Sequence, residues 1–441
     1  MKAVLFAVFL ALVCAVSSRK LLSSISVSNT SATNEPRYVF AHYMIGNSYA
    51  TTQEMFKIDL IHAVGMGVDG FALNLGPEDW MWDRVEKLYT AARDFPNFKL
   101  FFSFDMHRMG DPNAIVEWIR RFSNRPNTYK YNNKIFVSTF AGESQSFGES
   151  GPNEGWNNKI KNPLRNQGIE IFFVPAWTAM GPNNFFDRNW VVDGAFSWNS
   201  WPNGGSPMTT AEDDIYMNGA RQKGKAYMAP LSPWFYTHLP QWNKNFLYKS
   251  EFLLLDRWEQ MLRIKPEMIE IVTWNDWGES SYLGPIQGAK PENSDVYVDG
   301  YDHIAFREMS IPFLQAYKNG QDQPTINKDA FFFWYRPHSK NAGCGDGYGR
   351  PERWDLVEDN VYVVVFATSD AQMVINTGGQ SRGFPVRAGV NRVSTQFVVG
   401  SQSFELQRNG QPILKATGSV PVYDNCPKGT YNFNCITGVG K

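Results

Sequence analysis

Residues 98–106 read FKLFFSFDM, a nearly continuous apolar run that ends close to an aspartate. Residues 171–174, IFFV, have the same character. Runs of this kind are typical of parallel strands that helices cover on both faces, because such strands have no solvent-facing side that would require polar residues. The two stretches therefore predict an α/β fold that is built on a buried parallel sheet.

Eight such runs alternate with amphipathic segments of helical length. The expected strands are residues 38–46, 68–76, 98–106, 134–142, 169–177, 192–198, 225–234 and 268–277. The expected helices are residues 51–64, 79–94, 112–122, 154–166, 210–222 and 250–263. Eight βα units over about 245 residues match a (β/α)8 TIM barrel. The alternative is an open doubly wound sheet, but the sequence has no GxGxxG motif after its first strand and no Walker A segment.

The pattern changes after residue 317, where helical periodicity gives way to short expected strands at residues 330–335, 360–368, 396–399 and 403–406. Glycine and asparagine turns between them favour a C-terminal antiparallel β-sandwich domain. We therefore expect a catalytic barrel over residues 37–318 and a sandwich over residues 330–441. Trp334 and Tyr335 of the sandwich either pack against the barrel, which is favoured, or face a sugar ligand.

The N-terminal residues 1–18 combine Lys2 with an apolar run and a small-residue cleavage site, which is typical of a secretory signal peptide. An uncleaved signal anchor is the alternative. Residues 19–36 are rich in serine and contain the glycosylation sequon Asn29-Thr30-Ser31, so we expect a flexible leader. The mature protein is predicted to be secreted and not embedded in a membrane.

The composition favours an uncharged ligand. The chain has 42 basic and 43 acidic residues, so no net field would attract nucleic acid or an anionic membrane surface. Aromatic residues make up 15% of the chain and charged residues only 19%, a balance that suits sugars. We expect a monomer that binds a polysaccharide and does not bind nucleic acid.

The cysteines and histidines predict no metal site. Cys14 lies in the signal segment, which leaves Cys344, Cys426 and Cys435 to form one disulfide and one free thiol in an oxidising compartment. A short loop closed by Cys426 and Cys435 is favoured, and pairing of either with Cys344 stays open. The sequence contains no CxxC, HxH or HExxH motif, so neither a zinc site nor any other cofactor is expected.

Polar and aromatic side chains gather where the expected strands end. In a TIM barrel these ends form one rim, which carries the active site. A buried carboxylate without partners costs several kcal/mol, so function explains the set better than packing does, although any single member could be a turn or helix cap. The rim residues are His42, Asn47, Asn74, Asp105, His107, Ser138, Thr139, Trp177, Trp198, Trp201, Trp234, Tyr236, His238, Asn275, Asp276 and Glu279.

The densest segment of the rim is TWNDWGES, residues 273–280. Its carboxyl groups, Asp276 and Glu279, are three residues apart and have tryptophan neighbours, which exclude water and raise the pKa of a carboxyl. Cleavage of a glycosidic bond needs such a protonated acid together with an ionised carboxylate. Asp105 is a third candidate, or else a cap on the loop that follows it.

The sequence resembles the endo-α-1,3-glucanases, or mutanases, of glycoside hydrolase family 71. The resemblance runs in order through FAHYMIGN (40–47), VDGFALN (68–74), SFDM (103–106), FVSTFAG (136–142), SPWFYT (232–237), TWNDWGES (273–280), YVDG (297–300), WYRP (334–337) and YNFN (431–434). It implies a TIM barrel with a β-sandwich, hydrolysis of α-1,3-glucan with inversion, and essential acids at Asp105, Asp276 and Glu279. An extracellular or cell-wall location follows from the same reading.

The other rim residues are then expected to bind the glucan. The proposed stacking platforms are Trp177, Trp198, Trp201, Trp234, Tyr236 and Trp274. The proposed hydroxyl partners are His42, Asn47, Asn74, His107, His238, Asn275 and Tyr282. Glu279 is favoured as the general acid and Asp276 or Asp105 as the base.

The sequence departs from the family pattern at two places, which affects how far the properties of the family can be expected of this chain. Ser280-Ser281-Tyr282 stands where the family commonly has Ser-His-Tyr, and Cys435 follows the last motif where no thiol is expected. A non-catalytic glucan-binding protein and a cell-wall transglycosylase of the same fold remain alternatives. The transglycosylase would need carboxyl groups roughly 5 to 5.5 Å apart, whereas an inverting hydrolase needs about 6.5 to 9.5 Å.

Overall fold

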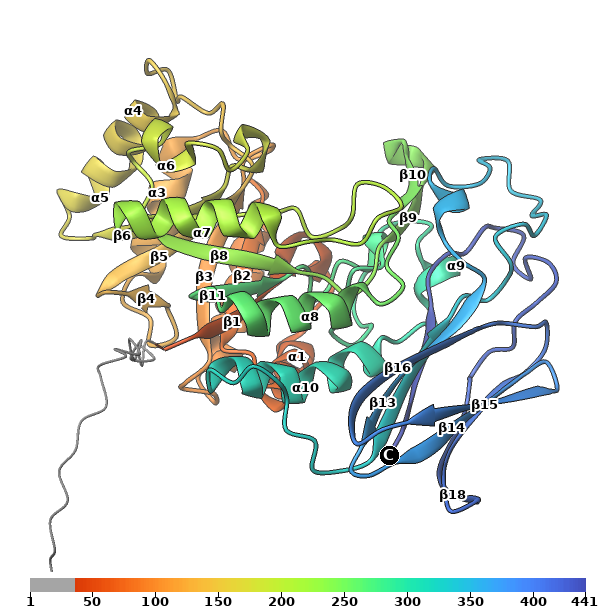
Figure 1. Ribbon diagram of the computed structural model, residues 1–441. Coiled ribbons are helices and arrows are strands. Elements are labelled where there is room, and N and C mark those ends of the chain that lie inside the picture. Colours follow the sequence, from red (N-terminus) through yellow and green to blue (C-terminus); the bar gives the residue numbers. More distant parts are fainter. Residues whose placement is uncertain (1–35) are drawn as a thin grey trace, which may run out of the picture. The chain divides into compact units, whose positions relative to one another are not determined.

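The computed structural model describes residues 36–441, which fall within one compact unit. The predicted signal peptide, and all of the predicted leader except residue 36, lie outside the described residues. Within residues 36–441, no helix has both the length and the apolar character that crossing a membrane requires. Figure 1 shows a parallel sheet with helices around it, next to the antiparallel strands of the C-terminal part.

A curled, mostly parallel sheet contains all eight strands that the sequence predicts. They are β1 (Tyr38–Met44), β2 (Gly70–Leu75), β3 (Lys99–Asp105), β5 (Lys134–Phe140), β6 (Ile171–Ala176), β7 (Gly194–Phe196), β8 (Ala226–Leu231) and β11 (Met268–Ile271). Their order is β6-β5-β3-β2-β1-β11-β8-β7, and the short strand β4 (Lys130–Tyr131) pairs antiparallel with β5. The end strands β6 and β7 meet at a backbone hydrogen bond of 2.8 Å from Asp193 N to Phe173 O.

The inner face of this sheet changes from apolar to polar along the strands. Phe40, Phe101 and Phe136 pack together early in β1, β3 and β5, with ring centroids 4.7 to 6.3 Å apart. Because side chains in a strand alternate between faces, residues two positions further on point to the same side. In β3 those residues are Ser103 and then Asp105, which ends the strand. The strand period therefore brings polar groups together at the carboxyl ends.

Helices connect the strands and cover the sheet. They are α1 (Gln53–Met66), α2 (Met81–Ala92), α3 (Pro112–Phe122), α4 (Pro152–Trp156), α5 (Asn162–Arg165), α6 (Phe185–Arg188), α7 (Ala211–Lys223), α8 (Leu253–Ile264), α9 (Asp295–Val298) and α10 (Ile304–Lys318). The single helix expected at residues 154–166 is divided by a π-helical turn, Asn157–Lys161. Thr52 caps α1 by accepting a hydrogen bond from Met55 N.

The C-terminal part consists of two four-stranded antiparallel sheets. One has the order β16 (Gly389–Gln396), β13 (Asn360–Ala367), β12 (Ala330–Tyr335) and β19 (Ile436–Gly440). The other has the order β15 (Gln380–Val386), β14 (Ala371–Thr377), β17 (Gln402–Arg408) and β18 (Gln411–Thr417). The strand expected at residues 396–399 is wrong, because β16 ends at Gln396 and the chain then turns.

Strand β12 is buried on both faces. Phe331 and Phe333 belong to the core between the two antiparallel sheets, whereas Phe332 and Trp334 belong to the core shared with the parallel-sheet layer. The indole of Trp334 donates to the Glu251 backbone oxygen at 2.9 Å, so it packs against that layer and does not face solvent.

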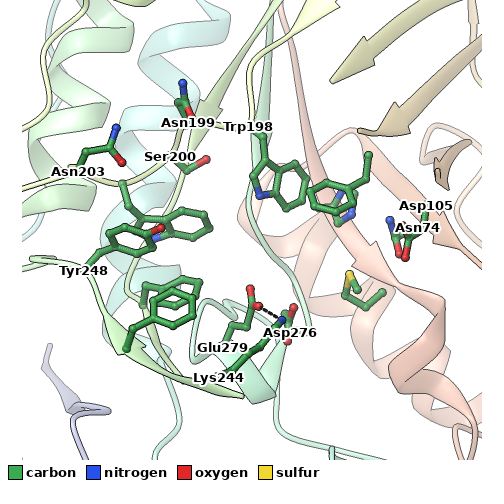
Figure 2. A pocket seen from close by; sticks show the side chains of 16 residues that line it. Asn74, Asp105, Trp198, Asn199, Ser200, Asn203, Lys244, Tyr248, Asp276 and Glu279 are labelled. Carbon is green, nitrogen blue, oxygen red and sulfur yellow. Dashed lines mark hydrogen bonds and ion pairs between the residues drawn. The ribbon is translucent and has the colours of Figure 1, made fainter. Parts of the chain in front are cut away.

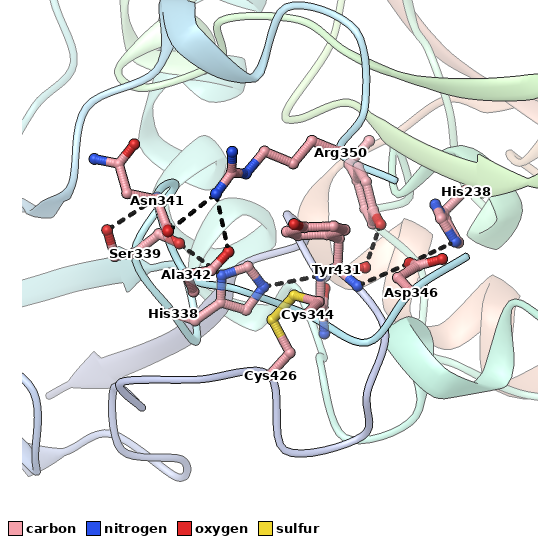
Figure 3. Close-up of a disulfide and its surroundings, with 12 residues drawn as sticks. His238, His338, Ser339, Asn341, Ala342, Cys344, Asp346, Arg350, Cys426 and Tyr431 are labelled. Carbon is pink, nitrogen blue, oxygen red and sulfur yellow. Dashed lines mark hydrogen bonds and ion pairs between the residues drawn. A yellow bond between two sulfur atoms is a disulfide. The ribbon is translucent and has the colours of Figure 1, made fainter. Parts of the chain in front are cut away.

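The disulfide joins Cys344 to Cys426, with Cα atoms 5.3 Å apart, and Figure 3 shows it beside His338. The favoured pairing of Cys426 with Cys435 is therefore wrong. Cys435 is a buried free thiol whose Sγ lies 3.6 Å from His303 Nε2, in the packing between α10 and the start of β19. The prediction favoured two cysteines that are close in sequence, whereas the partner of Cys426 is 82 residues away along the chain.

Candidate active site

A cavity of about 340 Å³ opens at the carboxyl ends of the parallel strands, and Figure 2 shows its side chains. Seven of the predicted site residues line it: His42, Asn74, Asp105, Trp198, Trp201, Asp276 and Glu279. The other lining residues are Met44, Phe140, Asn199, Ser200, Asn203, Phe235, Lys244, Phe246 and Tyr248. All three predicted acids thus meet in one cavity, although they come from β3 and from the segment after β11.

The segment after β11 is held by hydrogen bonds that fix Asp276 and Glu279. Trp274 N donates to the backbone oxygen of His42 at 2.7 Å, and Asp276 N donates to Thr273 Oγ1 at 2.9 Å. The short helical turn Trp277–Glu279 follows, and its Gly278 oxygen accepts a hydrogen bond of 2.9 Å from Tyr297 Oη. The spacing of three residues thus spans a tight turn, which places both carboxyl groups on the cavity.

Asp276 is the carboxyl group that retains a proton most readily. Burial, followed by the negative charge of Glu279, raises the pKa of Asp276 to about 7, against an ordinary value of 3.8. Lys244 opposes this shift. The neighbouring Glu279 forms an ion pair with Lys244, with Nζ 2.7 Å from Oε1. The two carboxyl groups therefore have different surroundings, as an acid–base pair requires.

Lys244 is the cation of the site. Burial alone would lower the pKa of its ammonium group, but the charges of Glu279, Asp276 and Asp105 raise that pKa overall. Figure 2 shows Lys244 reaching Glu279 next to Asp276. One cation thus faces three carboxyl groups, and its direct contact is with Glu279.

Asp105 and His42 form a second polar group in the cavity. Burial raises the pKa of Asp105, although the backbone N–H of His107, 3.1 Å from Oδ1, partly offsets the shift. His42 Nδ1 lies 2.6 Å from Glu270 Oε1, and both side chains are fully buried. His42 Nε2 has no hydrogen-bond partner among the described residues. This arrangement orients the imidazole and leaves its second ring nitrogen buried without a hydrogen-bond partner among the described residues.

Five predicted platforms or partners are buried and do not line the cavity. Trp177, Trp234, Tyr236, Trp274 and Tyr282 are each at most 5% exposed. Four of them donate hydrogen bonds into the protein: from Trp274 Nε1 to Asp59, from Trp234 Nε1 to the Phe433 oxygen, from Tyr236 Oη to the Tyr431 oxygen, and from Tyr282 Oη to the Tyr301 oxygen. The structure therefore places these rings in the packing beneath the site.

The remaining predicted residues lie around the cavity without lining it. The Asn275 side chain bridges the backbone N and O of Met44, and Asn47 donates to the Asn275 oxygen. Asn47 also lowers the pKa of Asp276 by a side-chain hydrogen bond. His107 is exposed beside Phe140, and His238 is buried between Asn245 and Asp346.

Lys244, Phe246 and Tyr248 were missed by the sequence reading. Lys244 and Phe246 lie in a hairpin of β9 (Tyr236–Leu239) and β10 (Lys244–Leu247), which follows β8, and Tyr248 comes directly after it. The sequence signal for this hairpin is weak, because its strands are short and only Pro240 and Asn243 mark the turn. The ring of Tyr248 stacks on Trp201, with centroids 5.7 Å apart.

A loop of the C-terminal part braces this hairpin. Asp346 Oδ2 lies 3.1 Å from His238 Nε2 and accepts a hydrogen bond from Tyr431 N (Figure 3). Asn245 donates to the Gly349 oxygen at 3.1 Å, and its own backbone oxygen accepts from Glu352 N. The Cys344–Cys426 disulfide fastens the same loop to the segment before Tyr431. The position of Lys244 therefore depends on the antiparallel sheets.

The departure at Ser281 does not remove a cavity-lining group. Ser281 is fully buried, its backbone oxygen accepts from Thr273 N, and its hydroxyl lies 3.3 Å from Thr273 Oγ1. Tyr282 stacks on His303, with ring centroids 4.0 Å apart. Position 281 thus belongs to the support of the loop.

One cavity at the ends of a parallel sheet holds a carboxyl pair in unequal surroundings, a third carboxyl group and aromatic rings. These features define a glycoside hydrolase. The sequence places this enzyme within a family. The chain belongs to glycosyl hydrolase family 71, whose sequence model matches residues 35–441.

Relatives of known name are similar over nearly their whole length. The chain is 42% identical over 411 residues to the glucan endo-1,3-alpha-glucosidase agn1 of Schizosaccharomyces pombe, covering 92% of this chain and 95% of that protein. It is 34% identical over 421 residues to the ascus wall endo-1,3-alpha-glucanase of the same yeast, covering 90% and 96%. It is also 34% identical over 425 residues to the mutanase Pc12g07500 of Penicillium rubens, covering 94% and 91%.

Proposed function

We propose that this enzyme hydrolyses α-1,3-glucosidic bonds in α-1,3-glucan with inversion of configuration. The observation that carries the proposal is the unequal pair Asp276 and Glu279 at the cavity, in a chain whose relatives are named for this substrate. Inversion needs one carboxyl group that donates a proton to the leaving oxygen and another that deprotonates the attacking water.

The surroundings favour Asp276 as the general acid, which reverses the sequence-based preference for Glu279. A pKa of about 7 keeps Asp276 protonated below neutral pH, whereas Glu279 forms an ion pair with Lys244. Glu279 is then the base that activates water. Asp105 and His42 bind sugar hydroxyls on the β1–β3 side of the cavity, and Trp198, Trp201 and Tyr248 supply ring surfaces for the sugar.

The proposal also covers the domain architecture, the oligomeric state and the location of the enzyme. The parallel sheet is taken as a closed (β/α)8 barrel over residues 37–318, with its seam at Asp193 and Phe173, followed by the sandwich over residues 330–441. The protein acts as a monomer after removal of residues 1–18 and export. A place outside the cell or at its wall agrees with the name of the ascus wall relative.

Incubation of the purified protein with insoluble α-1,3-glucan tests the function. Reducing ends are counted, and NMR within the first minutes identifies the anomer that is released. Inversion at an α-glucosidic bond gives the β-anomer, so we expect that product first. The α-anomer or lengthened chains would support the transglycosylase alternative, and binding without release would support a glucan-binding protein.

The pH dependence of kcat follows from the pKa of Asp276. The acid must be protonated, so activity is present below a pH of about 7 and is lost above it. We expect kcat to fall by about tenfold per pH unit on the alkaline side. The measurement is kcat on soluble α-1,3-oligosaccharides between about pH 5 and about pH 9. A kcat that stays constant to the alkaline end would contradict this role for Asp276.

A further inference from the structure

Several large aromatic side chains on segments adjoining those that line the cavity are exposed to solvent. Tyr49 is 60% exposed, Trp242 is 57% exposed and Tyr348 is 36% exposed. Single exposed apolar residues are common on protein surfaces, but neighbouring ones that gather beside a site mark a binding surface. The positions of these rings relative to the cavity therefore decide what they do.

Trp242 and Tyr348 both lie at the turn of the β9–β10 hairpin, which carries the cavity residue Lys244. Trp242 ends the helical turn Pro240–Trp242 at the tip of the β9–β10 hairpin, two residues before Lys244. Tyr348 belongs to the bracing loop, and its hydroxyl donates to Asn243 Oδ1 at 3.2 Å. The two exposed rings therefore come from distant parts of the chain to one turn of the hairpin.

Tyr49 and Trp80 lie together on the β1–β2 side of the cavity. Their ring centroids are 5.1 Å apart, with planes at 86°. Tyr49 follows the helical turn Ile45–Ser48, which begins directly after the cavity residue Met44. Trp80 lies in the loop that connects β2, which contains the cavity residue Asn74, to α2. In Figure 2, Asn74 lies on one side of Asp276, and Glu279 lies on the other.

The size of the cavity indicates what the two aromatic pairs do. A volume of about 340 Å³ is near the lower end of the roughly 300 to 1,000 Å³ found for small-molecule pockets. A polysaccharide chain therefore extends beyond it in both directions when a bond in its middle is cut. The C–H faces of sugar rings are apolar, and flat aromatic side chains bury them well.

We infer that Tyr49–Trp80 and Trp242–Tyr348 are two outer sugar-binding surfaces that hold an α-1,3-glucan chain on either side of the cleavage site. The inference rests on the proposed function and deepens it, because binding on both sides makes the enzyme cut within chains. It also gives the C-terminal part a direct role in binding, through Tyr348.

The test compares Trp242→Ala and Tyr49→Ala with the control Trp190→Ala. Trp190 is 53% exposed but precedes β7, at the opposite end of the strands. Each enzyme is assayed on long soluble α-1,3-glucan and on a short α-1,3-linked oligosaccharide. We expect kcat/KM on the polymer to fall by about five- to tenfold for both rim variants, with little change on the oligosaccharide or in the control. Trp242→Tyr should restore most of the loss, because it keeps a flat ring.

Sedimentation with insoluble α-1,3-glucan in a Glu279→Gln background measures binding separately from turnover. Weaker binding by Trp242→Ala and Tyr49→Ala, with the control unchanged, supports the inference. Equal loss on both substrates, equal loss in Trp190→Ala, or wild-type behaviour of both rim variants would overturn it and leave the proposed function intact. Wild-type protein that neither cleaves nor binds α-1,3-glucan would overturn the proposed function, and the inference with it.

Discussion

Asp276→Asn and Glu279→Gln are each expected to lower kcat on α-1,3-glucan by about two to four orders of magnitude, with little change in KM. Each substitution keeps the shape of the side chain and removes its ability to donate or accept the proton of the reaction. Asp105→Asn is expected to lose most turnover as well, because it removes the third carboxyl group of the cavity. Initial rates at saturating substrate, with circular dichroism to confirm folding, give the result.

The exposed Glu292 offers a matched control for these acids. It lies in the loop after the turn Trp277–Glu279, and its backbone oxygen accepts a hydrogen bond from Gln241. Glu292→Gln makes the same chemical change outside the cavity, so its kcat should equal that of the wild type. If Asp276→Asn and Glu279→Gln retained wild-type rates as well, the assignment of the pair would be wrong.

Lys244→Met is expected to reduce kcat by about 10- to 100-fold and to move the alkaline limb of its pH profile to higher pH. Lys244 faces Glu279, Asp276 and Asp105, and its charge lowers the pKa of Asp276 and Asp105. Without it, Glu279 loses its ion-pair partner. The alkaline limb moves upward because the pKa of Asp276 rises.

Lys244→Arg separates this charge effect from a packing effect. An arginine keeps the positive charge next to Glu279, so the pH profile should return close to that of the wild type, even if altered geometry lowers kcat. Full pH profiles of both variants, with thermal unfolding as a check on the hairpin, complete the test. A Lys244→Met enzyme with wild-type kcat and an unchanged profile would show that the lysine does not act on the pair.

The periodic parts of the fold were predictable from sequence, because each strand carries its own local pattern. All eight parallel strands occur where the apolar runs lie, and Asp105, Asp276 and Glu279 were found because they end or follow strands. Trp177 and Trp274 could not be told from Trp198 and Trp201, since a buried indole and one that lines a cavity have the same local sequence. Only packing distinguishes them.

Lys244 and the disulfide were missed for a different reason. Both depend on contacts between segments that are far apart in the chain, such as Asn245 with Gly349 and Cys344 with Cys426. No local period encodes such pairs, and short hairpin strands leave little pattern to detect. The acids that line the cavity were therefore predictable from the sequence, and the cation that distinguishes them was not.

The brace on the hairpin also limits how this enzyme can be divided or recombined. If the chain ended at Lys318, His238 and Asn245 would lose Asp346 and Gly349, and the wall that carries Lys244 would have no fixed position. The antiparallel sheets are therefore not an exchangeable accessory module that can be lost or replaced between relatives while activity persists. We therefore expect a chimera joined between residues 318 and 330 to be active only when its hairpin and its bracing loop come from compatible parents.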